Sequence, residues 1–274
     1  QALFAQCATH SECANAEASV TATHAMLARV GPLPGSAPWT HQYGDAANSV
    51  KSDDQLVKAP FGILWFGGSS NEALLPRHSH GPPEQIIGGR LFIEGSDIMR
   101  ALDVYTGRVL WEASLPGIGA PFNVLERNPG ANHIGTNYAC AEDGVYVAYG
   151  EQCIHLDPAT GAVASTLDLP GNHVFSQVKI WDDLLIAAAD PKVFDSGPIG
   201  ENNWNATCSE YLCILDRSSG ELLWYRRADN AFHHNTIIIG NGTLFCIHRL
   251  PPGQEAALAR RGLTPKDIGV TYKI

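Results

Sequence analysis

Nearly the same short sequence motif, here called the phrase, occurs three times along this chain. It reads LDVYTGRVLW at 102–111, LDPATG at 156–161 and LDRSSGELLW at 215–224. The three aspartates stand 54 and 59 residues apart, which is near the length of one four-stranded propeller blade with loop insertions. Because each copy of a repeat builds the same supersecondary unit, this period constrains the fold more than the composition does.

The chemistry of the phrase is that of a tight hairpin turn. Its aspartate ends an alternating strand, and the short carboxylate can accept hydrogen bonds from the backbone N–H groups that follow. Its glycine can take the left-handed conformation that closes a short hairpin, after which the returning strand starts. We expect equivalent hairpin ends in three units, built on Asp103, Gly107, Trp111, Asp157, Gly161, Asp216, Gly220 and Trp224.

Further apolar strands precede each hairpin, so each unit contains about four short strands. A lone meander exposes both faces of its sheet, whereas radial stacking of units buries them. The sequence therefore predicts an all-β fold, a partial β-propeller of four-stranded antiparallel blades with about four blades present. The apolar segments that repeat in this way are 89–93, 144–147, 183–186 and 242–246.

The first copy resembles the quinoprotein-type propeller repeat, Ala-x-Asp-x-x-Thr-Gly-x-x-x-Trp, at every position from Ala101 to Trp111. The third copy keeps the aspartate, glycine and tryptophan. In the second copy His155 replaces the alanine and Ser165 replaces the tryptophan. The resemblance implies that Trp111 and Trp224 dock against neighbouring blades, with a looser contact at Ser165.

A longer stretch resembles the bacterial PQQ-binding-like β-propeller repeat proteins. It comprises WTHQYGD at 39–45, LW at 64–65 and PRHSHG at 76–81. The resemblance covers roughly residues 38–274 and is specific for the fold rather than for an activity.

Charge excludes one class of partner. The chain has 28 acidic and 18 basic residues, a net charge of −10, which argues against a nucleic-acid surface. No run reaches the ~18 apolar residues of a membrane helix. The sequence thus predicts neither a nucleic-acid partner nor a transmembrane segment.

The two ends differ from the repeat. Residues 1–38 read as an N-terminal helical tail and linker, with an Ala- and Glu-rich helix over 11–29 and a Pro/Gly linker over 31–38. Residues 39–274 read as the partial propeller, truncated at the C-terminus, because the chain stops where the phrase would next occur. A helix over 254–261, after two prolines, is expected to decorate one rim.

Seven cysteines leave at least one thiol unpaired within the chain. Cys7 and Cys13 flank a short polar loop and could form a disulfide. The others lie in or near strands and are expected to act as small buried hydrophobes: Cys140, Cys153, Cys208, Cys213 and Cys246.

One histidine recurs at an equivalent place in each blade: His80, His133, His173 and His233. If these residues line the mouth of the central channel, they form a collar that binds a metal or an anionic ligand. The alternative is structural, with each histidine bonded to the backbone of the neighbouring blade.

Two function classes remain open. The first is a non-catalytic ligand- or protein-binding module of a larger extracytoplasmic protein, periplasmic or extracellular, whose rims bind protein or polysaccharide through Trp181, Trp204 and Tyr211. The alternative, by resemblance, is a PQQ- and calcium-dependent alcohol or sugar dehydrogenase. That enzyme needs oxygen ligands for calcium near the axis, and the only candidates are Glu84, Asn132, Asn172 and Asp190.

Overall fold

A computed structural model describes residues 6, 10, 15–67, 73–75, 81–123, 130–192 and 207–271. The chain forms two compact units. The first consists of Gln1–Ala37 and Asp53–Gly62, and the second of Pro38–Ser52 and Ile63–Ile274.

The first unit contains a β-hairpin where the sequence predicted a helix. Strand β1 (Ala16–Val20) pairs antiparallel with β2 (Ala25–Arg29). The turn between them is held by Thr21, whose Oγ1 accepts a hydrogen bond from the His24 N–H at 3.1 Å. The helix prediction is therefore wrong over 15–29, because this local turn and the β-branched residues near it outweigh a weak compositional preference for helix. Residues 11–14 lie outside the described residues.

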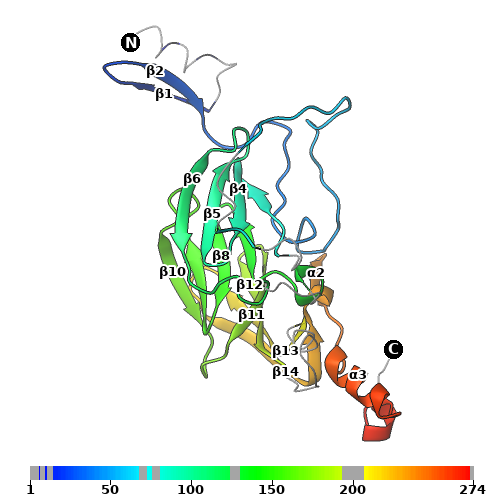
Figure 1. Ribbon diagram of the computed structural model, residues 1–274. Coiled ribbons are helices and arrows are strands. Elements are labelled where there is room, and N and C mark those ends of the chain that lie inside the picture. The colour runs from blue at the N-terminus through cyan, green and yellow to red at the C-terminus, as the bar shows by residue number, and fades with distance from the viewer. Residues whose placement is uncertain are drawn as a thin grey trace. The chain divides into compact units, whose positions relative to one another are not determined.

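The second unit contains three antiparallel sheets of four strands and one of two strands, in chain order (Figure 1). We call them blade 1, blade 2, blade 3 and the half-blade. The predicted propeller architecture is confirmed, although the fourth sheet has two strands among the described residues.

The strands of blade 1 are β3 (Gln85–Ile87), β4 (Arg90–Glu94), β5 (Ile98–Asp103) and β6 (Val109–Ser114). Those of blade 2 are β7 (Tyr138–Ala141), β8 (Gly144–Tyr149), β9 (Gln152–Leu156) and β10 (Val163–Asp168). Those of blade 3 are β11 (Phe175–Trp181), β12 (Leu184–Pro191), β13 (Cys208–Asp216) and β14 (Leu222–His233). The half-blade has β15 (Ile238–Gly240) and β16 (Thr243–Phe245).

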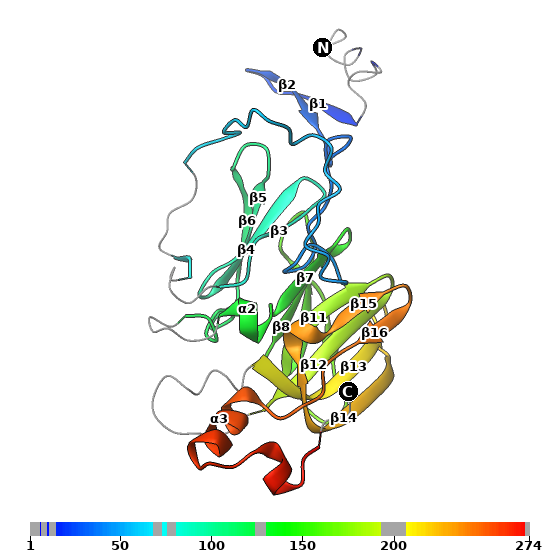
Figure 2. The same ribbon diagram turned by 90° about the vertical axis from the view of Figure 1, so that its right-hand side faces the viewer.

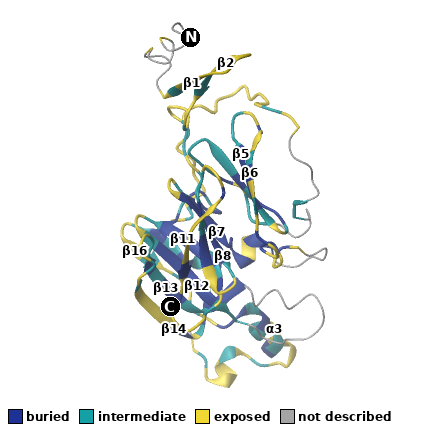
Figure 3. Ribbon diagram, turned by 90° about the vertical axis from the view of Figure 1, so that its left-hand side faces the viewer, coloured by how far each residue is buried: buried dark blue, intermediate teal, exposed yellow. Residues whose placement is uncertain are grey.

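The core lies in layers between consecutive sheets. One buried cluster joins blades 1 and 2, a second joins blades 2 and 3, and a third joins blade 3 to the half-blade. The first strands of neighbouring blades, β3 with β7 and β7 with β11, also contact each other. Strands β7, β8, β11 and β12 are accordingly buried along most of their length (Figure 3). Each blade thus covers a face that its neighbour would otherwise expose.

The three repeated turns form as predicted. In each, the aspartate Oδ1 accepts hydrogen bonds from the backbone N–H groups two and three residues ahead, at 2.7–3.0 Å. The glycine four residues after the aspartate has φ of +70°, +73° or +76°, a left-handed conformation that favours glycine because it has no Cβ. The turns join β5 to β6, β9 to β10 and β13 to β14.

Two tryptophans connect a turn to the preceding part of the chain. Trp65 Nε1 donates to the Val104 carbonyl at 2.9 Å, and Trp111 Nε1 donates to the Pro158 carbonyl at 3.0 Å. In both cases the acceptor directly follows the turn aspartate. A Cβ at Gly107 or Gly161 would lie within 2.5 Å of the indole ring, so the glycine also makes room for the tryptophan. We call this arrangement a tryptophan lock, and the docking predicted for Trp111 is confirmed.

After β16 the chain leaves the repeat. Residues 247–249 pair with the end of β14, and then α3 (Pro252–Arg260) and η6 (Pro265–Ile268) follow (Figure 2). The predicted helix over 254–261 is therefore confirmed with a slightly earlier start. Two short elements precede first strands: α2 (Ala131–Ile134) lies before β7, and η5 (His234–Thr236) lies before β15.

In the described part of the chain no two cysteines form a disulfide with each other, and four of the five are buried; Cys246 is half-buried. Cys7 and Cys13 lie outside the described residues. Among the helices of the described part, none is long and apolar enough to cross a membrane.

Candidate functional site

A single segment, residues 39–48, crosses the first strands of the four sheets described in the second unit. We call it the strap. Trp39 exchanges two backbone hydrogen bonds with Ile86 of β3, both 2.8 Å long. The remaining contacts follow in chain order: the Thr40 carbonyl accepts from Cys140 N–H of β7, His41 Nε2 from Ile180 N–H of β11, and the Ala46 carbonyl from Ile239 N–H of β15, each at 3.0 Å.

Two ionisable side chains are buried where the strap meets blade 3. His41 is 4 % exposed and Lys179 of β11 is 5 % exposed. Lys179 Nζ donates to Asn48 Oδ1 at 2.5 Å and to the Ala46 carbonyl at 3.3 Å. Burial lowers the pKa of His41 to about 3, helped by the nearby Lys179 charge, and it lowers the pKa of Lys179 to about 8. At neutral pH the histidine is therefore uncharged and accepts the Ile180 hydrogen bond through Nε2.

Polar side chains also connect the strap to α2 and η5. Gln42 Nε2 donates to the Ala131 carbonyl at 2.6 Å, and Asn48 Nδ2 donates to the Asn235 carbonyl at 3.2 Å. His234 is fully buried, and its Nδ1 donates to the Ile134 carbonyl at 2.6 Å. Because that carbonyl can only accept, the other ring nitrogen must accept the Ser209 hydroxyl proton at 2.7 Å. Burial lowers the pKa of His234 to about 4.

The described histidines of the predicted collar have different surroundings. His133 lies on α2 and is exposed. His173 Nδ1 lies 2.7 Å from Asp190 Oδ2, while His233 Nε2 lies 3.2 Å from the Leu250 carbonyl. His80 is outside the described residues. No group of three or more His, Cys, Asp or Glu side chains within the described ranges could hold a metal ion, and the collar as a ligand site stays a prediction.

The residues proposed for a calcium and quinone site do not fit that role. The Asp190 carboxylate is already engaged, with Oδ2 on His173 and Oδ1 accepting the Val174 N–H at 2.9 Å. Asn132 lies on α2, where its carbonyl accepts from Asn235, and its side chain is exposed. Glu84 and Asn172 are also exposed and lie before different blades. The four side chains thus offer no common set of buried oxygen ligands.

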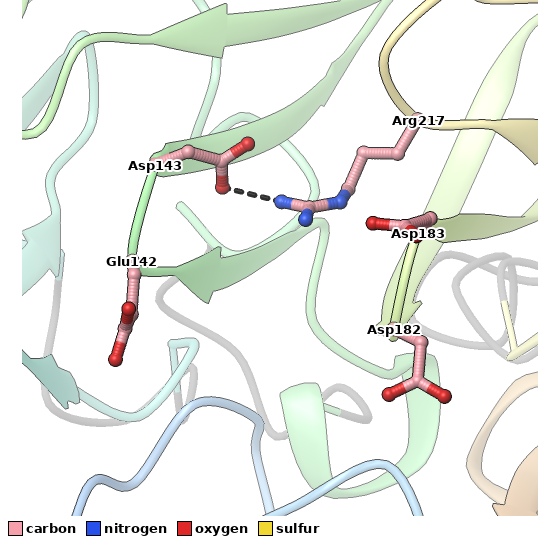
Figure 4. A pocket seen from close by; sticks show the side chains of 5 residues that line it. All are labelled: Glu142, Asp143, Asp182, Asp183 and Arg217. Atoms are coloured by element: carbon pink, nitrogen blue, oxygen red, sulfur yellow. Dashed lines mark hydrogen bonds and ion pairs between the residues drawn. The ribbon is translucent and has the colours of Figure 1, made fainter.

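At the junction of blades 2 and 3 an ion pair takes the place of a tryptophan lock, because blade 2 has Ser165 where the repeat has tryptophan. Arg217 directly follows the turn aspartate of blade 3, and its guanidinium pairs with Asp143 of blade 2 (Figure 4). It also lies 5.4 Å from the ring centroid of Tyr146, whose hydroxyl donates to Asp143 at 2.9 Å. The His155 ring stacks on Tyr146 with centroids 4.3 Å apart. We call this set the arginine clamp.

The clamp explains two departures from the repeat consensus. Ser165 is too short to reach the next turn, and His155 instead supports the tyrosine under Arg217. Leu167, rather than a tryptophan, packs beside the turn glycine Gly220. A Cβ added to Gly220 would lie 3.1 Å from the Leu167 side chain. The hollow around Arg217 also contains Glu142, Asp182 and Asp183 (Figure 4), and we interpret it as part of the blade junction rather than as a ligand site.

Arg217→Ala is expected to lower the free energy of unfolding by about 1–2 kcal/mol, from a partly buried ion pair and a cation–π contact. Urea unfolding of this variant, of Asp143→Asn and of the double variant measures the coupling directly. Arg227→Ala is the matched control, because Arg227 pairs with Glu210 but is 68 % exposed. Equal losses for Arg217→Ala and Arg227→Ala would contradict a clamp.

Apolar side chains are left exposed on β14 and near β16. Trp224 is 44 % exposed, against 7 % for Trp111, so its predicted docking between blades is wrong for the described residues. Leu223, Tyr225, Phe245 and Ile247 are each more than half exposed. The rim residues predicted to bind a partner differ: Trp181 and Tyr211 are half-buried against core clusters, and Trp204 lies outside the described residues.

Comparison with known proteins gives fold-level likeness only. No protein-family model matches the sequence, and no curated protein matches it either. Solved structures that match include a quinohemoprotein alcohol dehydrogenase from Comamonas testosteroni, with 16 % identity and a TM-score of 0.46 over 70 % of this chain and 27 % of that one. A europium-containing methanol dehydrogenase has 14 % identity and a TM-score of 0.45, over 70 % and 32 % of the two chains. BamB from Moraxella catarrhalis has 13 % identity and a TM-score of 0.37, over 80 % and 54 %.

The chain thus spans about a third or less of the two dehydrogenases. The fold class of this chain follows from its own sheets, turns and tryptophan locks. Their arrangement is the one expected of a quinoprotein-type propeller repeat. Sequence reasoning missed His41, Lys179 and His234. The only available signal was the WTHQYGD stretch, whose residues could not be assigned to distant strands.

Proposed function

We propose that this chain is a non-catalytic, protein-binding propeller module. The observation that carries the proposal is the strap. It bonds to the first strand of each of the four sheets described in the second unit, so the chain's own backbone and buried side chains occupy the inner edge that an axial cofactor would need. A second observation also argues against the dehydrogenase alternative. The side chains proposed as calcium ligands offer no common set of buried oxygen atoms.

A protein suits the remaining surface better than a polysaccharide does. The exposed side chains of β14 and β16 are apolar and aromatic, as in the buried centres of protein interfaces. They also flank strand edges that can accept backbone hydrogen bonds. In keeping with the resemblance of the repeat, we place the module in the periplasm or outside the cell.

The proposal is tested by reconstitution. The purified chain is mixed with calcium and pyrroloquinoline quinone, and alcohol- or sugar-dependent dye reduction is measured. No reduction above the background without protein is expected. Turnover that Asp190→Asn abolishes would overturn the proposal, because it would assign that carboxylate a catalytic or calcium-binding role.

A further inference from the structure

A carboxyl group is buried at the junction of blades 1 and 2. Glu94 is the last residue of β4 and is 3 % exposed. It lies two residues after Phe92, so both side chains point to the same face of blade 1. Phe92 belongs to the apolar cluster that joins the two blades. The Glu94 side chain therefore lies in the contact between the blades.

The repeat shows that a blade does not need an acid at this position. In each blade, the residue four places before the turn aspartate pairs with one residue of the second strand. That residue is Glu94 in blade 1, Ala148 in blade 2 and Ala188 in blade 3. Both alanines are buried. A small apolar side chain thus fits this place, and Glu94 is a departure that blade packing alone does not explain.

The polar neighbour of Glu94 is Asn137, the residue before β7 of blade 2. Asn137 is 6 % exposed, and its side chain lies beside the Glu94 carboxyl group. Asn137 Nδ2 donates a long hydrogen bond of 3.4 Å to the Ile118 carbonyl. Among the described residues, neither Glu94 oxygen has a hydrogen-bond partner, and Asn137 Oδ1 has none either. Three buried acceptor oxygens are thus left without a donor.

A single proton on Glu94 supplies the donor that these oxygens lack. A carboxylate can only accept hydrogen bonds, and burying an unpaired one is costly. A carboxylic acid has one O–H that can donate to the amide oxygen, while its other oxygen accepts from the amide nitrogen. Burial raises the pKa of Glu94 well above its usual range, against an opposing effect of Asn137.

Within the described part of the chain, no positive charge faces Glu94. Tyr138 and Cys140 lie on the facing strand β7, and burial raises the pKa of both, so they are neutral at pH 7. Arg100 of β5 lies opposite Ile93, hence on the other face of blade 1, where it pairs with a glutamate of β6. Glu84, before β3, is exposed and acidic. An ionised Glu94 would therefore have no compensating cation among these groups.

We infer that Glu94 is a neutral carboxylic acid in the folded protein, that it donates a hydrogen bond to Asn137 Oδ1, and that this pair is a pH-sensitive contact between blades 1 and 2. When Glu94 ionises at higher pH, a buried charge faces an acceptor oxygen in place of the hydrogen bond, and the junction loosens. This device is independent of the proposed protein-binding function.

The inference determines the direction of the pH dependence. In the unfolded chain Glu94 ionises near the ordinary glutamate pKa of about 4.3, so above that pH the folded chain binds one proton more. The stability that this proton contributes is fully present below about pH 4.3 and is lost as the pH rises through the pKa of the folded protein. One proton corresponds to about a tenfold increase of the unfolding equilibrium constant per pH unit.

The first test compares the wild-type protein with Glu94→Gln, because a glutamine amide has nearly the shape of the neutral acid and cannot ionise. Urea unfolding gives both equilibrium constants at about pH 5, 6 and 7. Their ratio, wild type over variant, is expected to rise about tenfold per pH unit, since His41 and His234 are present in both proteins. Trp111→Ala, which weakens the same junction without removing an ionisable group, is the control and should give a constant ratio.

Infrared spectroscopy detects the proton directly. At pH 6 the difference spectrum between wild type and Glu94→Gln should contain the C=O stretching band of a protonated carboxylic acid, which carboxylates and amides lack. Asn137→Ala should keep this band and move it to higher frequency, because the acid loses its hydrogen-bond partner. If Glu94→Gln does not fold, Glu94→Ala replaces it in both tests, since alanine occupies the same place in blades 2 and 3.

Hydrogen exchange follows the junction itself. The Ala148 N–H donates to the Asn137 carbonyl at 2.7 Å, so its protection reports on the contact. As the pH rises, this protection should fall in the wild type relative to Glu94→Gln, whereas the amides of β13 in blade 3 should be protected alike in both proteins.

Several outcomes would contradict the inference. A constant ratio of unfolding constants, or no acid band, would show that Glu94 is ionised in the folded protein. Calcium chloride that stabilises the wild type but not Glu94→Gln would make the carboxylate a cation ligand instead. An unchanged band in Asn137→Ala would remove the acid–amide pair, and equal protection of Ala148 in both proteins would remove the pH-sensitive contact.

Discussion

Trp111→Ala is expected to lower the free energy of unfolding by about 3–5 kcal/mol, the range for truncating a buried tryptophan. The indole is 7 % exposed, its N–H bonds the Pro158 carbonyl, and its ring covers Gly161 and lies 5.9 Å from Phe92. The variant loses packing between two blades and leaves a half-buried carbonyl without its donor. Urea unfolding followed by circular dichroism measures the change.

Trp224→Ala is the natural control for that experiment. It removes the same side chain at the equivalent strand position, but Trp224 is 44 % exposed, so a loss below about 1 kcal/mol is expected. A comparable loss in both variants would mean that the lock contributes nothing beyond local strand stability. A small loss in Trp111→Ala would contradict its role in joining the blades.

Stability is expected to fall steeply on acidification. The pKa values of His41 and His234 are lowered to about 3 and about 4, in both cases chiefly by burial. Below pH 6.5 the unfolded chain therefore binds two protons that the folded chain does not. The stability present above pH 6.5 is lost as the pH falls, by about 1.4 kcal/mol per histidine and pH unit. Between pH 6.5 and 4.5 the two residues together cost about 5 kcal/mol.

The measurement is the free energy of unfolding in urea at several pH values. His41→Gln and His234→Gln should each flatten the slope by about one proton, whatever their effect at neutral pH. Identical slopes for all variants would show that neither buried histidine controls the acid response.

The blades were predictable because their signals are local. An aspartate, a glycine four residues later and flanking alternating strands define a hairpin without reference to the rest of the chain. The docking of Trp111 followed from the repeat itself, since each blade has a neighbour of the same kind. The same reasoning failed for Trp224, because the chain departs from the repeat at residues 247–249. The two prolines and the helix predicted after them mark the place of this departure, but they do not predict that the backbone pairs with the end of β14.

The candidate site was less predictable because its contacts are distant in sequence. His41 and Lys179 are far apart in the sequence and lie close together only in the folded chain, and no spacing rule connects them. Of the histidines selected by their period, His173 and His233 contact separate partners, whereas the buried ones, His41 and His234, are not periodic. The hairpin of β1 and β2 was missed for a different reason, since alanine and glutamate favour a helix only weakly and a short turn reverses the outcome.

The strap also bears on how this protein is made. Its residues are synthesised before every strand that they bond to in the second unit, and the last of those strands, β15, is synthesised only after all three blades. Early blades can collapse on the ribosome, but the strap must wait with unsatisfied backbone groups until the half-blade arrives. Contacts of such long sequence separation slow the final folding step. We therefore expect docking of the strap to be a late folding event that follows synthesis of all three blades, and a chaperone that shields extended segments to raise its yield.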